Sequence, residues 1–283
     1  MILKDLFTDI AGFAEFVPGI YSNTNLTLLN SHAVTAYKRI ANIVSVPVYK
    51  KIIEQGEGEL YDYLRTALAN LTMANDTVFD VLRKRKAEID IYKSEQEAIR
   101  RAYYENYYNA MDSLIALLNT TKDLGWEDTR YYKMLDKLQI KTTEEFDMLY
   151  CIDLSYLFFF RCIPIQVEVM DESLSGYIER AKENSSVMSL INRALAKKVV
   201  AIALTRFDIL EFPSTIRNLF DDSKASRTGR DEQQRLLVLS AQLQDQANGL
   251  IKDIDLLLSD SQSTDIETET SFNQPEDKIQ LMP

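Results

Sequence analysis

Two long amphipathic segments with the same spacing of apolar residues constrain the fold of this chain most strongly. In residues 95–119, apolar positions follow at steps of four, three, four and three, which places them on one face of an α-helix: Tyr103, Tyr107, Ala110, Leu114 and Leu117. Residues 231–259 carry the same steps, with each position equal to its counterpart plus 140: Leu243, Ala247, Leu250, Ile254 and Leu257. The spacing predicts two long helices of similar design.

Two further patterns recur in the same order in the second half of the sequence, and they indicate a divergent duplication of one helical unit. The dipeptide Glu-Phe at positions 15–16 returns at positions 145–146, a shift of 130 residues. The apolar stripe of residues 64–74 returns at residues 200–210, a shift of 136 residues. The shifts increase steadily toward 140, as a few small insertions would produce. Any two amphipathic helices share a three-four rhythm, and residue identity between the halves is poor, so the prediction rests on pattern.

We therefore expect an all-α protein of two tandem helical units, residues 1–125 and 126–258, with an extended polar C-terminal arm, residues 259–283. Two stretches, 44–48 and 163–169, alternate apolar and polar residues and predict one or two short strands. The chain has only 8 glycines and 6 prolines among its 283 residues. This scarcity argues against all-β folds and Gly-rich nucleotide-binding folds, because both need many special turns.

Residues that carry catalytic or metal chemistry are scarce. His32 is the single histidine, so a zinc site, a Ser-His-Asp triad or a Cys-His pair would each depend on it. Cys151 and Cys162 lack metal-ligand spacing, and we interpret both as core thiols in a reducing compartment. Neither a GxxxxGK[ST] loop nor a GxGxxG turn occurs in the sequence. The sequence predicts no enzyme, no metal and no cofactor.

Charge and hydropathy bear on the partners of the protein. The net charge of −11 argues against binding to nucleic acid through a basic face, and it suits a surface past which DNA slides without sticking. The longest apolar run, Leu154 to Ile165, contains Arg161 and is too short to span a bilayer. The first residues carry acids where a signal peptide has a basic region. We expect no membrane partner.

Several residues are candidates for a protein–protein interface. The basic run at 83–86 is either a solvated helix end or a docking patch for an acidic partner. The tyrosines beside the first stripe are either core residues whose hydroxyls reach water or part of a subunit contact. The single tryptophan is either a packing anchor or an interface hot spot. Apolar residues of the arm are candidate anchors on another chain. The candidates are Arg83, Lys84, Arg85, Lys86, Tyr104, Tyr108, Trp126, Phe272, Ile279 and Leu281.

Four stretches of the first half, taken in order, resemble a known family. They are FxxFVP at 13–18, IxxxVxVPVYKKI at 40–52, LYDYLRTALANLTMAND at 60–76 and YYxAMDSLIALL at 107–118. This order is similar to proteins encoded by Bacteroidetes phages and prophages that look like the helical head–tail connector (adaptor or head-completion) proteins of tailed phages. The resemblance is best over residues 6–118, and the second half follows it only as a weaker repeat.

The resemblance implies a structural virion protein of the phage neck, with no catalytic residue to carry over. It implies a homo-oligomeric ring of twelve copies that joins the portal protein to a tail protein or a second adaptor ring. DNA would only pass through the channel, and the ring would be assembled in the host cytoplasm and lie in the virion between capsid and tail. The alternative is a non-viral helical protein–protein interaction module without catalysis, with the arm as a peptide ligand.

Overall fold

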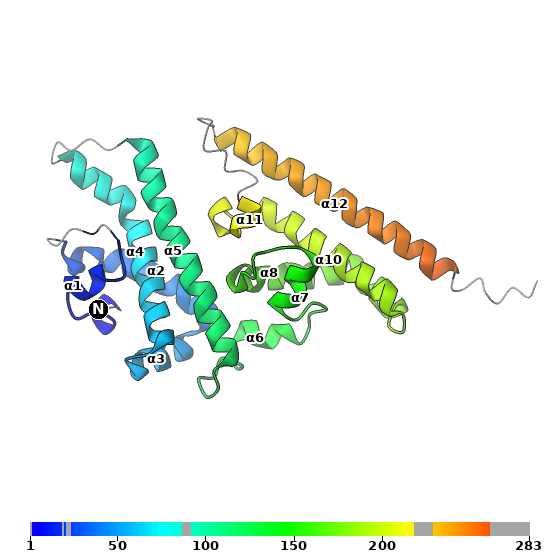
Figure 1. Cartoon of the computed structure of the whole chain (residues 1–283), viewed down its shortest axis with the longest axis horizontal. Coiled ribbons are helices and arrows are strands. Elements are labelled where there is room, and N and C mark those ends of the chain that lie inside the picture. Colours follow the sequence, from blue (N-terminus) through cyan, green and yellow to red (C-terminus); the bar gives the residue numbers. More distant parts are fainter. Residues whose placement is uncertain (1, 19, 21–23, 87–91, 218–228, 261–283) are drawn as a thin grey trace, which may run out of the picture.

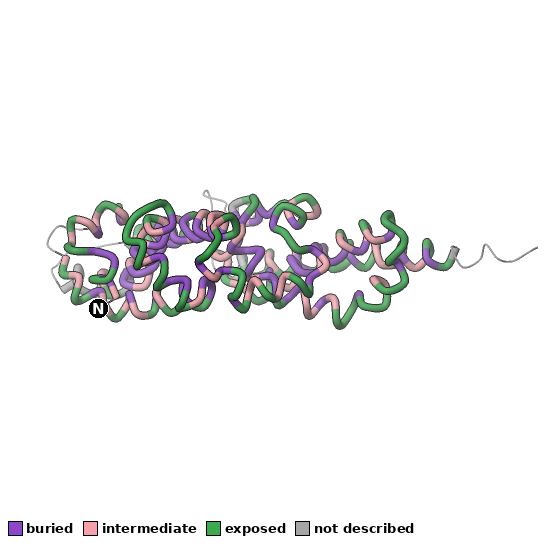
Figure 2. The backbone as a smooth tube through the Cα atoms, turned by 90° about the horizontal axis from the view of Figure 1, so that it is seen from below, coloured by how far each residue is buried: buried purple, intermediate pink, exposed green. Residues whose placement is uncertain are grey.

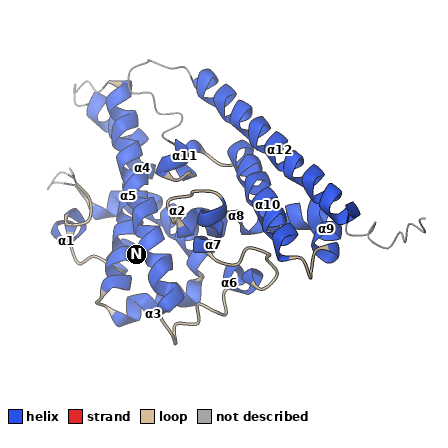
Figure 3. Cartoon of the chain, turned by 45° about the vertical axis from the view of Figure 1, so that its right-hand side comes forward, coloured by secondary structure: helices blue, strands red, loops and turns tan. Residues whose placement is uncertain are grey.

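The computed structural model describes residues 2–18, 20, 24–86, 92–217 and 229–260. Every regular element in these ranges is helical, so the all-α prediction is confirmed (Figures 1 and 3). The expected short strands are wrong, because residues 44–48 lie where one helix ends and the next begins, and residues 163–169 lie inside a helix. That helix is buried on almost every side, and a run that is apolar all round cannot be told from a strand by its periodicity alone.

The first unit is built around a hairpin of two long helices. Its elements are η1 (Ile2–Asp5), α1 (Ile10–Ala14), α2 (Leu26–Val44), α3 (Val46–Gln55), α4 (Glu59–Lys86) and α5 (Lys93–Thr120). The Asn25 side chain accepts a hydrogen bond from the Thr27 amide and so caps α2, while Gly56 ends α3 at φ +71°. Ser45 separates α2 from α3 at φ +72° and accepts a bond from the Val48 amide at 3.4 Å. Helix α2 packs on α4, and α4 packs along α5.

The second unit contains several short helices and a second pair of long ones. Its elements are α6 (Arg130–Leu135), α7 (Thr143–Leu149), α8 (Tyr156–Val169), η2 (Met170–Leu174), α9 (Ser175–Arg180), α10 (Ser185–Arg206), η3 (Ile209–Glu211), α11 (Ser214–Arg217) and α12 (Gly229–Asp260). A π-helical turn, η2, joins α8 to α9 without a break. Helix α8 packs on α10, and α10 packs along α12. The arm expected at 259–283 begins at the end of α12, and residues 261–283 lie outside the described ranges.

The two predicted stripes face the core, with one correction. Four of the five positions in α5 are buried and Leu117 is half-buried. In α12, Leu243, Ala247 and Ile254 are buried and Leu250 is half-buried. Leu257 was expected on this stripe but is 45% exposed, and its neighbour Leu258 is buried instead. A strict 3.5-residue spacing drifts across a straight helix of 3.6 residues per turn, so the last contact moves on by one position.

Helix α12 is held on α10 by polar contacts as well as by its stripe. The buried Ser240 hydroxyl donates to the Ala201 carbonyl oxygen at 2.7 Å, and the Lys197 ammonium donates to the Gln246 side chain. Figure 1 shows α12 along the outer side of α10. The outward side of α12 therefore faces solvent in the single chain.

The helix pairs recur in the same order in the two halves. In the first half α2 packs on α4 and α4 on α5, and in the second half α8 packs on α10 and α10 on α12. This order supports the predicted duplication, which stays a prediction. Helix α5 also packs on α8, and one hydrophobic core runs through both halves (Figure 2). We call this contact between α5 and α8 the junction, because it joins the first half of the chain to the second.

Candidate functional site

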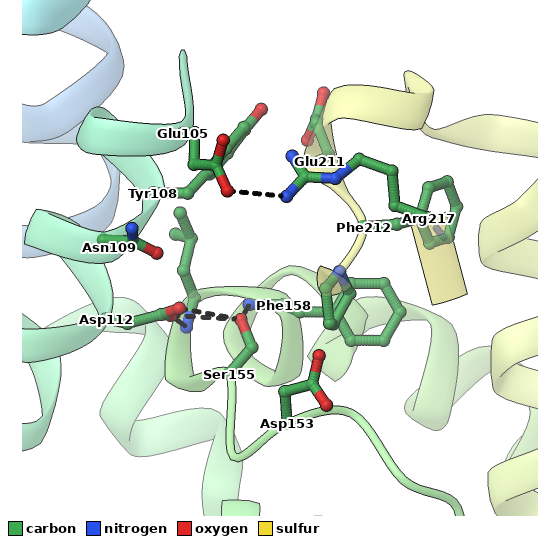
Figure 4. A pocket seen from close by; sticks show the side chains of 12 residues that line it. Glu105, Tyr108, Asn109, Asp112, Asp153, Ser155, Phe158, Glu211, Phe212 and Arg217 are labelled. Atoms are coloured by element: carbon green, nitrogen blue, oxygen red, sulfur yellow. Dashed lines mark hydrogen bonds and ion pairs between the residues drawn. The ribbon is translucent and has the colours of Figure 1, made fainter. Parts of the chain in front are cut away.

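A pocket of about 230 Å³ lies at this junction, where α5, the loop before α8, η3 and α11 come together (Figure 4). Acidic and amide side chains from α5 line one side of it, and Asp153 and Ser155 line another. Phe158 and Phe212 form an apolar wall. Convergent polar groups beside an apolar wall are what a binding site or an active site would present.

Asp112 joins α5 to the N-terminus of α8. Its carboxylate accepts hydrogen bonds from the Ser155 hydroxyl at 3.1 Å and from the Leu157 amide at 2.7 Å. Ser155 in turn caps α8 by accepting a bond from the Phe158 amide at 3.2 Å. Burial raises the pKa of Asp112 to about 6, and these hydrogen bonds oppose the shift. The carboxylate therefore links α5 in the first half of the chain to the start of α8 in the second half.

Asp153 ties the loop before α8 to α11. Asp153 and Leu154 both have left-handed backbones, at φ 55° and 51°. The Asp147 carboxylate holds this turn by accepting bonds from the amides of Ile152 at 2.7 Å and Leu154 at 3.1 Å. The Asp153 carboxylate accepts bonds from both the amide and the hydroxyl of Thr215. A left-handed backbone costs on the order of 1–2 kcal/mol per residue, and these hydrogen bonds hold the turn in place.

Glu211 lies between two arginines at the edge of the pocket. Its carboxylate is 2.9 Å from the Arg161 guanidinium and 3.4 Å from the Arg39 guanidinium. Arg39 also donates to the Tyr108 hydroxyl at 3.2 Å and lies over the Tyr107 ring. Burial raises the pKa of Tyr107 to about 12 and raises the pKa of Tyr108. Paired charges in this cluster join α2, α8 and η3, and the hydrogen bond and ring contact of Arg39 add α5.

The hydroxyl of Ser155 donates to the Asp112 carboxylate, and no histidine is among the residues described around the pocket. His32 lies elsewhere, between α2 and α4, with its Nε2 3.4 Å from the Asp76 carboxylate. Within the described ranges, His, Cys, Asp and Glu side chains form no group of three or more that could hold a metal ion. None of the described helices combines the length and apolar character needed to cross a membrane.

Of the two interpretations of Trp126, the structure favours the packing anchor over the interface hot spot. This residue is only 2% exposed, and its indole nitrogen donates to the Asn119 side chain at 2.8 Å. Its ring packs against Phe160 and Tyr132. Trp126 is therefore an anchor in the core of its own chain and offers no surface to a partner, because the loop after α5 folds back over α8.

The two candidate tyrosines also make their main contacts within the chain. Tyr104 is 8% exposed and stacks on Tyr108. Tyr108 is half-buried, and its hydroxyl binds Arg39. The core interpretation describes Tyr104 better than the subunit interpretation. Of the two cysteines, Cys162 is buried as expected, whereas Cys151 was expected in the core and is exposed.

The remaining candidates lie at or beyond the edge of what the structure describes. Arg83, Lys84, Arg85 and Lys86 form the last turn of α4, and their side chains lie outside the described part. Phe272, Ile279 and Leu281 lie outside the described residues altogether. Their predicted role in an interface stays a prediction.

Sequence reasoning missed the most exposed apolar side chain described, that of Met148 on α7, which is 81% exposed. Tyr92, just before α5, is 74% exposed. Met148 follows Glu144, Glu145 and Asp147, but Phe146 in the same stretch is fully buried, so the sequence carried no clear signal for the exposure of Met148. Apolar side chains this exposed are candidates for contact with another protein.

Comparisons with known proteins add no relative. No family model, no curated protein and no solved structure matches this chain.

Proposed function

We propose that this protein is a structural virion protein of a tailed phage: a ring-forming head–tail connector that joins the portal to the tail around the DNA channel. The proposal rests on the different places of the polar and the apolar side chains. The polar side chains of the pocket hold helices together, while large apolar side chains lie exposed on outer surfaces. A scaffold subunit needs both kinds of group. Its internal polar contacts make it rigid, and its exposed apolar side chains provide the affinity for neighbouring chains.

The resemblance to phage connectors gives the proposal its specific form. Its four stretches lie in α1 and the residues after it, in α2–α3, in α4 and in α5. They contribute to the core through Phe13, Ile40, Leu64 and Tyr107, among others. The residues that resemble phage connectors are thus the ones that build the helical core of the first half of the chain. The net charge of −11 suits a channel wall past which DNA slides.

The test is the assembly state of the purified protein, alone and with the portal protein of the same phage genome. We expect rings by negative-stain electron microscopy and a multiple of the protomer mass by light scattering. A stable monomer with no affinity for the portal protein would refute the proposal.

Substitutions in the C-terminal arm distinguish the connector proposal from the interaction-module alternative. Substituting serine for Phe272, Ile279 and Leu281 is expected to weaken ring or portal assembly while the helical circular dichroism stays unchanged. A matched control carries three conservative changes in the same arm: Thr264→Ser, Thr268→Ser and Thr270→Ser. Loss of one binary interaction, with assembly intact, would favour the module instead.

A further inference from the structure

Helix α12 has a second face that the described part of the chain leaves uncovered. Its stripe, with Leu243, Ala247 and Ile254, is buried against α10, and Figure 1 shows α12 as the outermost described helix on that side. On the opposite side of α12, Val238 is 51% exposed and Leu256 is 65% exposed. These two residues lie eighteen positions apart, or about five turns at 3.6 residues per turn, so both point away from α10.

The same side of α12 carries an acid, a glycine and a base between the two apolar residues. Counted from Val238, Asp245 follows after about two turns, Gly249 after about three and Lys252 after about four. All three of these residues are exposed. We call the five residues the outer face of α12: Val238, Asp245, Gly249, Lys252 and Leu256.

Nothing in the described packing of this chain requires a glycine at position 249. A Cβ atom added to Gly249 would meet no described heavy atom within 4 Å outside its own helix, so the space beside it is open. Its φ is not positive, so the backbone conformation does not require glycine either. Glycine destabilises the interior of a helix relative to alanine, because it loses more backbone freedom on folding. Glycine is useful at such a position where another backbone comes close, which points to a second helix on the outer face.

The order of the charges on the outer face indicates that the second helix is a copy of α12 running in the opposite direction. In an antiparallel pair centred beside Gly249, Asp245 of each copy lies level with Lys252 of the other copy, so two ion pairs form. A parallel pair would place each of these charged residues opposite its own counterpart, where like charges repel one another. The outer face is therefore complementary to itself in the antiparallel arrangement.

We propose that two copies of this chain associate through the outer faces of their α12 helices, which pack antiparallel about a two-fold axis. Gly249 lets the helices approach closely at the centre. At both ends, Leu256 of one copy comes within one turn of Val238 of the other copy, and their apolar area leaves water. Both copies use the same surface, so the contact closes on two copies and does not extend around a ring. The pair therefore goes beyond the proposed connector, which needs other contacts to close its ring.

The main experiment exchanges the two charges in the full chain. Asp245→Lys and Lys252→Asp, each made alone, place like charges opposite one another at both ion pairs, and each is expected to weaken self-association by roughly tenfold or more. A mixture of the two single variants pairs opposite charges again and is expected to regain the association of the wild type. Sedimentation velocity over a protein concentration series measures the monomer and the dimer. Single variants that associate as tightly as the wild type would overturn the antiparallel pair.

Two further variants separate a loss of association from a loss of folding. Gly249→Leu introduces a better helix former into open space, so the thermal midpoint of the monomer should stay the same or rise, whereas the pair should weaken by roughly tenfold or more. Leu256→Gln is also expected to weaken association. Its control is Leu28→Gln, which changes a leucine of α2 that is 64% exposed and is expected to leave association unchanged. Unchanged association of Gly249→Leu, or equal effects of the two glutamine variants, would contradict the contact.

The outcomes also separate the pair from the proposed function. Wild-type rings that persist unchanged in both single charge variants would overturn the pair and leave the connector proposal standing. A wild-type dimer that forms no ring and does not bind the portal protein, and that both charge variants dissociate, would support the pair and refute the connector. A wild type that stays monomeric at every concentration and has no affinity for the portal protein would refute both.

Discussion

The carboxylate of Asp112 is placed where two electrostatic effects compete, and the substitution Asp112→Asn measures which one is larger. Burial at the junction of α5 and α8 disfavours the charged form. The N-terminus of α8, with the Leu157 amide at 2.7 Å, favours it. Burial is the larger effect, and it raises the pKa of Asp112 from 3.8 to about 6.

A raised pKa in the folded state fixes the direction of the pH dependence. As pH rises above 3.8, the unfolded chain releases the Asp112 proton before the folded chain does, so the folded state loses stability until pH passes about 6. The full loss is on the order of 3 kcal/mol. Between pH 5 and pH 7.5 the linkage relation gives a loss of about 1–2 kcal/mol. This window also stays above the sequence isoelectric point of about 4.8.

The assay is urea unfolding followed by the fluorescence of Trp126, which is buried near the same junction. The unfolding free energy of the wild type minus that of Asp112→Asn is expected to fall by about 1–2 kcal/mol from pH 5 to pH 7.5. The exposed control Asp253→Asn is expected to show a flat difference. A difference that rises with pH would refute the reasoning, because it would mean that the helix terminus outweighs burial.

Three further predictions concern packing. Trp126→Phe removes a buried indole and its hydrogen bond, so the free energy of unfolding should fall by about 2–3 kcal/mol in urea titrations; an unchanged midpoint would argue against the anchor role. Ser240→Ala removes the bond to the Ala201 carbonyl between α12 and α10, and thermal unfolding should show a loss of about 1 kcal/mol. Ellman's reagent should modify the exposed Cys151 in the native protein and Cys162 only after unfolding, because Cys162 is buried and burial raises the pKa of its thiol. Equal rates of modification would contradict the burial of Cys162.

The local helical structure was predictable because it depends on neighbours in sequence. The stripe at Tyr103 and Tyr107 and the scarcity of glycine and proline indicate helices, and the structure confirms an all-α chain. The same reasoning misjudged residues 163–169, because a helix buried on almost every side has no polar face to reveal its period. It also misplaced Leu257 by one position at the end of a long stripe.

The junction between the units was not predictable from the sequence. Asp112 binds groups more than forty residues away, and Arg39 and Glu211 come from opposite halves of the chain. A pattern of apolar residues says which face of a helix is buried, and it does not say which helix covers that face or which carboxylate meets which guanidinium. The pKa of Asp112 likewise depends on how much water the assembled helices exclude.

The amino-acid sequence by itself determined that this protein is helical and acidic and has a single histidine, because composition and periodicity are local properties. Only the tertiary structure decided that Trp126 is internal, that Met148 is exposed and that the polar groups of the pocket are joined to one another. The physical reason is that the burial of a side chain and the partner of a polar group depend on which residues lie near it in space. Side chains with the same local signal can lie in the core or at the surface, depending on which helices pack over them.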